Sequence, residues 1–326
     1  MKTSILSSYG LRICMASLLT LALFGNASFA QGVVPGTGTK ISKVGDDFED
    51  PNWGFNYRLP KVYNYKDETV RSNGPSGRSK NGRWYEGMKR GQPDFIKWVP
   101  TPQDGLPGST GSLALQSLYT GVKGRPTYQQ QQDDFICDVM YRFGKIATSR
   151  EPSVVTRVFF PPVDQWENRT GCHFAFRIAL ETYPRPAKGG GLFSSSKDEG
   201  FDGIYWPGMF IDFQSKEGKK ATGKDHDYAY IRIRATSRGG EYKGKQLDRT
   251  GWWTLGISLS RDGRVHYYAK PGVQDLTKED HIASHRPYGY QPLRFRTFFF
   301  NVCNGDDNKT WSSRLIIDDP SVYVVR

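Results

Sequence analysis

Cysteine, long apolar runs and helical periodicity are all scarce in this sequence of 326 residues. Beyond residue 30, no apolar run is long enough to cross a bilayer, which argues against an integral membrane protein built from helices. No stretch repeats apolar residues at helical spacing between capping residues, which argues against a helical bundle. The cysteines that follow residue 30 have no zinc-ligand spacing, so we expect no structural zinc site.

The first thirty residues have the features of a cleavable signal peptide. Lys2 and Arg12 provide basic residues, and residues 13–24 form an apolar segment that is too short for a convincing membrane span. Residues 28–30 read Ser-Phe-Ala, which fits a small-x-small cleavage pattern. We therefore predict a signal peptide over residues 1–30, a secreted protein of the periplasm or extracellular space, and no transmembrane segment in the mature chain.

Three cysteines remain after this leader, namely Cys137, Cys172 and Cys303. An odd number in an exported chain suggests either one disulfide with one free thiol or no pairing at all. Cys172 precedes the strand-like segment FAFRIAL, and Cys303 follows the strand-like segment RTFFFNV. These two cysteines would be able to pair only if the two strands are neighbours, and the sequence leaves that open.

Basic residues outnumber acidic ones, with a formal net charge of +12 for the whole chain. Such a balance favours acidic partners, including sulfated or uronate polysaccharides, envelope polymers and nucleic acid. A merely solvated basic surface is an equally good interpretation. Nucleic acid is the poorest of these partners, because the chain is expected to be exported and has no basic helix or RNA-binding sheet motif.

Short strands separated by turns dominate the rest of the sequence. The strand-like segments are 134–143, 153–160, 173–180, 209–214, 228–235, 252–270, 294–302 and 314–325. Residues 93–117 are rich in turn residues, and residues 31–45 lack periodicity, so we expect a flexible lead-in there. About ten short strands with glycine and proline turns predict one all-β domain over residues 46–326, an antiparallel β-sandwich or jelly roll.

Residues 252–273 show the clearest hairpin pattern in the chain. Apolar side chains alternate with small or polar ones up to Leu259, and the pair Asp262-Gly263 suits a tight turn. The returning strand should place Val265, Tyr267 and Ala269 on one face and Arg264, His266 and Tyr268 on the other. The second face would expose a row of cationic and aromatic side chains able to hold a polar, anionic ligand.

Other predicted strands also have one polar and aromatic face. The proposed ligand-binding residues are Tyr228, Tyr230, Arg232, Arg234, Asp212, His173 and Arg264. Arginine forks match carboxylate or sulfate groups, and tyrosine rings can stack on sugars. The alternative is an ordinary solvated face, since an antiparallel sheet often has one face toward water.

Three segments carry a resemblance to a known superfamily: DDFED-x-x-W from residue 46, WWTLGISLSRDGRVHYYAKPGV from residue 252, and RLIIDDPSVYVV near the C-terminus. The chain resembles the concanavalin A-like lectin/glucanase superfamily, a laminin-G-like jelly roll, and in particular secreted bacterial proteins with this domain. The resemblance covers about residues 46–326 and implies that the first and last strands lie side by side. It specifies architecture more than activity.

The superfamily includes hydrolases, lyases and non-catalytic glycan-binding modules. Its Glu-x-Asp-x-x-Glu hydrolase motif is absent, since the nearest segment, MFIDFQ, offers Asp212 and then Gln214. Lyases neutralise a uronate with Arg and Gln or Asn, and use His and Tyr as base and acid. The resemblance therefore implies four candidate catalytic residues: Arg177, Gln214, His266 and Tyr268. A packing role for His266 within the hairpin is the alternative.

The resemblance also implies that a structural Ca²⁺ ion could bind between the terminal strands. Carboxylates suit this ion, and the candidates are Glu49, Asp50, Asp318 and Asp319. Solvated acids in a turn are the alternative.

The preferred function is a secreted protein that binds an acidic extracellular polysaccharide through a Tyr/Arg-rich sheet face. The alternatives are a polysaccharide lyase that acts by β-elimination on a uronate polymer and a non-catalytic cell-envelope scaffold or adhesion module.

Overall fold

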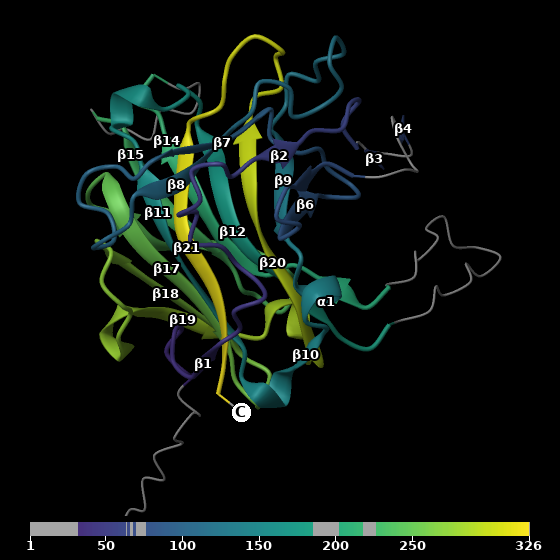
Figure 1. The fold of residues 1–326 in the computed structure, drawn as a ribbon, viewed down its shortest axis with the longest axis vertical. Helices are drawn as coiled ribbons and strands as arrows, with labels where there is room; N and C mark the ends of the chain where they lie inside the picture. Colours follow the sequence, from purple (N-terminus) through teal and green to yellow (C-terminus); the bar gives the residue numbers. More distant parts are fainter. Residues whose placement is uncertain are drawn as a thin grey trace, which may run out of the picture. The chain divides into compact units, whose positions relative to one another are not determined.

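Two antiparallel β-sheets make up most of the fold (Figure 1). The computed structural model describes residues 32–62, 64–65, 68–69, 76–184, 202–217 and 226–325. The leader predicted over residues 1–30 lies outside these ranges. The all-β antiparallel sandwich predicted from the sequence is confirmed.

Sheet A contains eight strands among the described residues. They are β1 (Thr39–Lys40), β7 (Phe95–Pro100), β8 (Gly111–Gln116), β11 (Ser153–Phe160), β17 (Gly251–Leu259), β18 (Val265–Pro271), β19 (His281–His285) and β21 (Leu315–Val324). Their order is β19-β18-β17-β11-β21-β8-β7, and β1 pairs with β21. The expectation that the first and last strands lie side by side is thereby confirmed.

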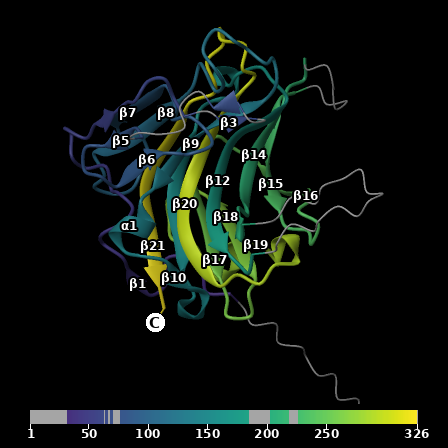
Figure 2. The same ribbon diagram turned by 90° about the vertical axis from the view of Figure 1, so that its right-hand side faces the viewer.

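Sheet B contains eleven strands within the same described ranges. They are β2 (Phe55–Asn56), β5 (Arg78–Ser79), β6 (Trp84–Glu86), β9 (Gln131–Cys137), β10 (Ile146–Ala147), β12 (Gly171–Glu181), β13 (Ile204–Tyr205), β14 (Gly208–Gln214), β15 (Tyr228–Arg234), β16 (Glu241–Leu247) and β20 (Arg294–Asn304). The order is β16-β15-β14-β12-β20-β9-β6-β5-β2, with β10 on β20 and β13 on β12. The long strands β12 and β20 run side by side through the middle of the sheet (Figure 2).

The remaining elements are short. They are the strand pair β3 (Asn64–Tyr65) and β4 (Glu68–Thr69), the helix α1 (Val139–Arg142), and the 3₁₀ helices η1 (Thr148–Arg150), η2 (Val163–Gln165), η3 (Lys278–Asp280) and η4 (Pro287–Gly289). Within the part of the chain that the structure describes, no helix has the length and apolar character needed to cross a membrane.

The two sheets enclose one aromatic-rich core. Trp84 of β6 stacks on Phe135 of β9 with ring centroids 4.5 Å apart and planes 6° apart. Trp253 of β17 and Phe298 of β20, from the two sheets, are fully buried in the same cluster. Because a strand alternates its side chains between two faces, each strand that sends residues into this core presents the intervening residues to the outside of the sandwich.

The hairpin of β17 and β18 has the predicted pattern. Leu255 and Ile257 lie in the core, and the residues between them lie on the outer face of sheet A. Gly263 in the turn has a φ of +82°, which glycine adopts without steric cost. Sequence periodicity therefore predicted this part of the architecture correctly.

The N-terminal segment is more ordered than expected for a flexible lead-in. Strand β1 pairs with β21, and Ile41 and Val44 are buried in the core. From Gly32 onward the segment belongs to the same compact unit as the sandwich. It lacks periodicity because it crosses the outside of sheet A and then turns inward.

Several strands differ from the sequence-based expectation. Strands β7 and β8 lie within residues 93–117, where turn residues dominate, and the strand expected over residues 134–143 ends at Cys137 before α1 begins. Strands β16 and β19 were not predicted. Both lie at sheet edges, where one unpaired side and partial exposure weaken the apolar alternation that identifies a strand.

Candidate functional site

The residues predicted to form a site lie on two different surfaces. Sheet B carries Arg177, Asp212, Gln214, Tyr228, Tyr230, Arg232 and Arg234. His266 and Tyr268 lie on β18 of sheet A. Both sets point away from the core, because Phe176 of β12 and Tyr267 of β18 point into it. The four candidate catalytic residues are therefore divided between opposite outer faces of the sandwich.

The outer face of β18 is covered, contrary to the exposed row expected there. His266 and Tyr268 are only 2% and 1% exposed. Tyr268 Oη donates to the carbonyl oxygen of Gly32, whose Cα packs so tightly on the His266 ring that an added Cβ would lie 2.3 Å from it. The imidazole nitrogens of His266 contact Ser260 Oγ and Ser284 Oγ at 2.7 and 2.6 Å. Burial lowers the pKa of His266 to about 4, so it is neutral at pH 7.

Arg264 also belongs to the hairpin turn and not to a sheet face. Its Nε lies 3.1 Å from Asp262 Oδ2, and the backbone N–H of Arg264 donates to Asp262 Oδ1 at 3.3 Å. The same Asp262 Oδ1 accepts from Ser260 Oγ. These contacts hold the turn between β17 and β18, which explains the position of Arg264 without a ligand.

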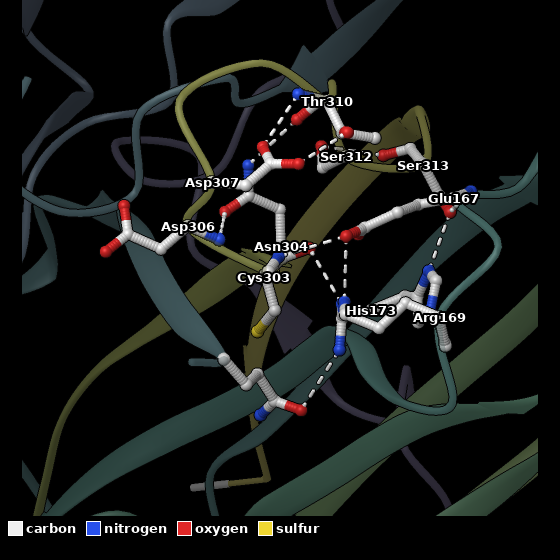
Figure 3. Close-up of polar contacts among 12 residues, drawn as sticks. Glu167, Arg169, His173, Cys303, Asn304, Asp306, Asp307, Thr310, Ser312 and Ser313 are labelled. Atoms are coloured by element: carbon white, nitrogen blue, oxygen red, sulfur yellow. Dashed lines mark hydrogen bonds and ion pairs between the residues drawn. The ribbon is translucent and has the colours of Figure 1, made fainter. Parts of the chain in front are cut away.

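His173 lies in a buried polar network beside a bulge of β12 (Figure 3). Its Nε2 contacts the carbonyl oxygen of Arg169 at 2.7 Å, and its Nδ1 contacts Ser313 Oγ at 2.7 Å. A carbonyl oxygen can only accept, so Nε2 carries the proton and Nδ1 accepts from the hydroxyl. Burial and the charge of Arg169 lower the pKa of His173 to about 3. His173 thus connects β12 to the loop that contains Ser313 and is closed off from the outer face of sheet B.

Three guanidinium groups converge on one ring on the outer face of sheet B. The guanidinium carbons of Arg177, Arg232 and Arg234 lie 5.2, 5.3 and 4.9 Å from the ring centroid of Phe210. Arg177 also lies 5.3 Å from the centroid of Phe299. These distances suit cation–π contacts, which hold the guanidinium groups at fixed positions.

Two of these arginines are neutralised by carboxylates. Arg232 Nε lies 2.8 Å from Asp212 Oδ2, and both Arg232 and Arg234 contact Glu241. Tyr230 Oη donates to Asp212 Oδ2 at 3.2 Å. Burial, followed by the charge of Asp212, raises the pKa of Tyr230 to about 12, so its hydroxyl keeps its proton.

The tyrosines of β15 form the rim of the same face. Tyr228 and Tyr230 have ring centroids 6.3 Å apart. Lys243 Nζ lies 4.9 and 4.7 Å from the two rings. Gln214 of β14 is the register partner of Tyr228, so it lies beside that ring at the same end of the two strands. The rim combines half-exposed rings with amide and ammonium groups.

Arg177 differs from its neighbours because no carboxylate neutralises it directly. The side chain is only 7% exposed. Nη2 donates to the Trp206 carbonyl at 2.9 Å and Nη1 to Asn301 Oδ1 at 3.5 Å, while Nε is buried without a hydrogen-bond partner. Among the described residues, no carboxylate oxygen lies within 4.0 Å of this guanidinium. Burial, followed by the charge of Arg234, lowers the pKa of Arg177 to about 10, against the opposing effect of the charge of Asp134.

A continuous row of register partners links Arg177 to the strands next to the two edges of the sheet. The row is Arg234, Gly208, Arg177, Phe299, Ile136, Tyr85 and Arg78, on β15, β14, β12, β20, β9, β6 and β5. Adjacent strands are ~4.8 Å apart, so six steps cover about 29 Å. A chain-like ligand would meet arginine at both ends and in the middle of this row.

A groove of about 890 Å³ lies at the Arg78 end of the row. Its lining residues are Asn56, Tyr57, Arg58, Ser76, Arg78, Tyr85, Met88, Met140, Tyr141 and Arg296. Tyr141 and Met88 are 76% and 62% exposed, and Arg78 Nη1 lies 2.9 Å from Asp138 Oδ2. Arg78 and Tyr85 belong to both the groove and the row, so the two form one surface, which we call the sheet B face.

Sequence reasoning missed several residues of the sheet B face. Alternation within DDFICDV places Asp134 and Ile136 opposite the core residue Phe135, so these two were detectable in principle. Asn301 follows the same rule on β20, where Asn301 Nδ2 donates to Asp134 Oδ1 at 2.6 Å. Glu241 gave no signal, because its edge strand reads EYKGKQL without apolar alternation.

The four carboxylates proposed for calcium have other partners in this structure. Glu49 accepts from Thr110, Asp50 accepts from a turn N–H, and Asp319 pairs with Lys40 at 2.9 Å. Burial raises the pKa of Asp318 to about 7. Within the described ranges, no group of three or more His, Cys, Asp or Glu residues could hold a metal ion. Calcium binding stays a prediction that these contacts do not test.

No family model and no curated protein matches this chain in sequence. Among solved structures, the carbohydrate esterase of Shiga toxin-encoding bacteriophage phi24B is similar at 10% identity and a TM-score of 0.42, covering 76% of this chain and 92% of that one. An alginate lyase from Pseudomonas aeruginosa has 9% identity and a TM-score of 0.38, with coverages of 71% and 86%. A legume lectin-like domain from Entamoeba histolytica has 9% identity and a TM-score of 0.35, with coverages of 75% and 91%. Similarity at this level assigns no activity to this chain.

Proposed function

We propose that this chain is an exported protein that binds an acidic polysaccharide across the sheet B face. The observation that carries the proposal is Arg177, a buried guanidinium with an unpaired Nε and no carboxylate oxygen within 4.0 Å among the described residues, although the charge of Asp134 acts on it from farther away. A buried charge is costly unless an opposite charge accompanies it. A carboxylate or sulfate of the ligand would supply that opposite charge.

The shape and chemistry of the sheet B face support a chain-like ligand. The row of register partners gives a track about 29 Å long at ~4.8 Å per strand. Tyr85 and Tyr141 offer ring surfaces in the groove, and Arg58 and Arg296 add positive charge there. Rings and arginine forks along one track suit a polymer that alternates apolar sugar faces with anionic groups.

Binding without cleavage is the better-supported form of this function. β-Elimination needs a base and an acid next to the group that neutralises the uronate. His266 and Tyr268 lie under Gly32 on sheet A, whereas Arg177 and Gln214 lie on sheet B. The carboxylates beside Arg232 and Arg234, Asp212 and Glu241, are held in ion pairs.

A binding panel tests this proposal. The purified protein is expected to bind a polyuronate or a sulfated glycan on the order of tenfold more tightly than a neutral polymer of similar length. Binding should weaken as salt rises, because added ions screen partly exposed charges. Affinity electrophoresis and calorimetry on both polymer classes, with duplex DNA included, measure the preference.

Two outcomes would overturn the proposal. If no acidic polymer is retained at low salt while a protein of the cell envelope is, the adhesion-module alternative replaces it. If ultraviolet absorbance rises on incubation with a polyuronate, the unsaturated product shows that the protein cleaves its ligand, and the lyase alternative replaces it.

Replacing His266 by glutamine distinguishes ligand binding at the sheet B face from ligand binding at the outer face of sheet A. His266→Gln should leave polymer affinity unchanged within about twofold, because the side chain lies on sheet A beneath Gly32. The variant is compared with the wild type by calorimetry at a temperature where both are folded. A large loss of affinity would mean that the ligand reaches the face that Gly32 covers.

A further inference from the structure

Cys172 and Cys303 lie close together beneath the sheet B face. Their Sγ atoms are 4.0 Å apart, and each side chain is 2% exposed. They form a small buried cluster with Ala175 and Phe210, the ring on which the three arginines converge. From this arrangement we infer that Cys172 and Cys303 form a disulfide that ties β12 to β20 beneath the ligand-binding face.

The strand geometry favours this particular pairing. β12 and β20 are antiparallel neighbours, and Phe174 pairs with Val302, one residue before Cys303. A register shift between Cys172 and Phe174 turns the Cys172 side chain to the outer side of the sheet, where Cys303 also lies. A bond of ~2.05 Å requires the two sulfur atoms to approach by about 2 Å, which side-chain rotation with a small backbone shift can supply.

Cys137 has no comparable partner among the described residues. It lies fully buried in the core between the sheets, where its Sγ accepts from the backbone N–H of Gly45 at 3.3 Å. Cys172 and Cys303, in contrast, point away from that core. The three cysteines therefore divide into one pair and one single thiol, which accounts for the odd number that follows the predicted leader.

The bond forms by oxidation of two thiols. Cys172 and Cys303 together lose two protons and two electrons, and an exogenous disulfide is reduced to two thiols through a mixed-disulfide intermediate. The contact with Cys303, together with burial, raises the pKa of the Cys172 thiol. A buried, protonated thiol reacts slowly, so we expect the exchange to take place while the chain folds, before β12 and β20 close.

This disulfide would stabilise the floor of the proposed binding face. The two cysteines are 131 positions apart in the sequence, so the bond would constrain a long segment of the unfolded chain. The inference rests on the proposed export, because an oxidising compartment supplies the disulfide acceptor. It does not require that the ligand be identified.

The experiment is thiol mapping of the wild-type chain without its predicted leader, residues 1–30, which contains Cys14; this chain is refolded with oxidised glutathione. After unfolding and alkylation without reductant, we expect label on Cys137 alone, together with one peptide pair joined through Cys172 and Cys303. Reduction should expose all three thiols and lower the melting temperature by on the order of 5–10 °C. Mapping by peptide identifies each thiol separately and does not depend on any variant.

Two variants sharpen the test. Cys137→Ser should leave no free thiol among the three positions, whereas Cys303→Ser should leave both Cys137 and Cys172 free. Label on all three cysteines of the refolded wild type, or a cross-link that involves Cys137, would overturn the inference. Polymer affinity is measured on the same samples, so a missing disulfide is distinguished from a missing binding function.

Discussion

Replacing Arg177 by glutamine is expected to weaken binding of an acidic polysaccharide by about 10- to 100-fold. The guanidinium is the central cation of the row, and no carboxylate oxygen among the described residues lies within 4.0 Å of it. A bidentate, charge-assisted contact to the ligand is among the stronger polar interactions in proteins. Calorimetry at low and high salt measures both the loss of affinity and the part of it that depends on charge.

Arg177→Lys is expected to lose less affinity than Arg177→Gln. Lysine keeps the charge but lacks the planar fork, and it cannot fill the space between Phe210 and Phe299 in the same way. The lysine variant should therefore retain the salt dependence of the wild type. Equal losses in both variants would show that geometry and not charge dominates this contact.

The effect of Arg177→Gln on stability should be small, within about 1 kcal/mol. The substitution loses hydrogen bonds to Trp206 and Asn301 but removes a buried charge that forms no ion pair with a described residue. Arg157 of β11, on sheet A, is the matched control, since it is 4% exposed and pairs with Asp275 of a loop and Asp319 of β21. Arg157→Gln loses charge-assisted hydrogen bonds but leaves Asp275 exposed to water, so it should lower the free energy of unfolding by about 2 kcal/mol and leave polymer binding intact.

This pair of variants distinguishes a binding residue from a structural one. If Arg177→Gln unfolds the protein as readily as Arg157→Gln, Arg177 serves packing and the site proposal fails. If both variants keep full affinity while folded, the ligand binds elsewhere. Thermal unfolding and binding titrations on the same preparations separate these cases.

Where a strand runs without a bulge, strand periodicity predicted which side chains share one face. The alternation of residues 228–234 placed Arg232 and Arg234 away from the core, and the structure agrees. The same rule placed Leu255 and Tyr267 in the core. Period two determines these faces because each residue of a strand reverses the side-chain direction of the one before it.

Periodicity could not predict which sheet each strand joins or what covers its outer face. Strands β14 and β18 both present polar outer residues, but β14 lies in the middle of sheet B and β18 lies near an edge of sheet A. Gly32 covers His266 from a position more than two hundred residues earlier in the chain. Contacts at that sequence separation leave no local pattern, so the outer face of β18 looked as accessible as that of β15.

Acidification is expected to destabilise the protein partly through His173. Folding lowers the pKa of His173 from about 6.5 to about 3, mainly by burial and then by the charge of Arg169. Between these two pKa values, the unfolded state binds more protons than the folded state. The contribution of His173 to the free energy of unfolding is therefore fully present above about pH 6.5 and is lost as the pH decreases. The contribution of His173 to the loss should reach about 3 kcal/mol by about pH 4.5.

His173→Gln should remove that part of the pH dependence. The amide can donate to the Arg169 carbonyl and accept from Ser313, but it does not titrate. Urea unfolding from neutral pH to about pH 4.5 should therefore show a flatter stability profile for the variant than for the wild type. Parallel profiles would mean that His173 is protonated in the folded protein and that its contacts with Arg169 and Ser313 differ from those described.

Asp318 provides a control, because its effect on the pH dependence of stability is opposite in sign to that of His173. Burial raises its pKa from about 3.8 to about 7, so the folded state binds more protons than the unfolded state between these values. Protonation of Asp318 consequently stabilises the fold as the pH decreases, and Asp318→Asn should make the acid-induced loss of stability steeper. Opposite changes of slope in the His173 and Asp318 variants would show that buried groups on the two sheets together determine the acid stability of the sandwich.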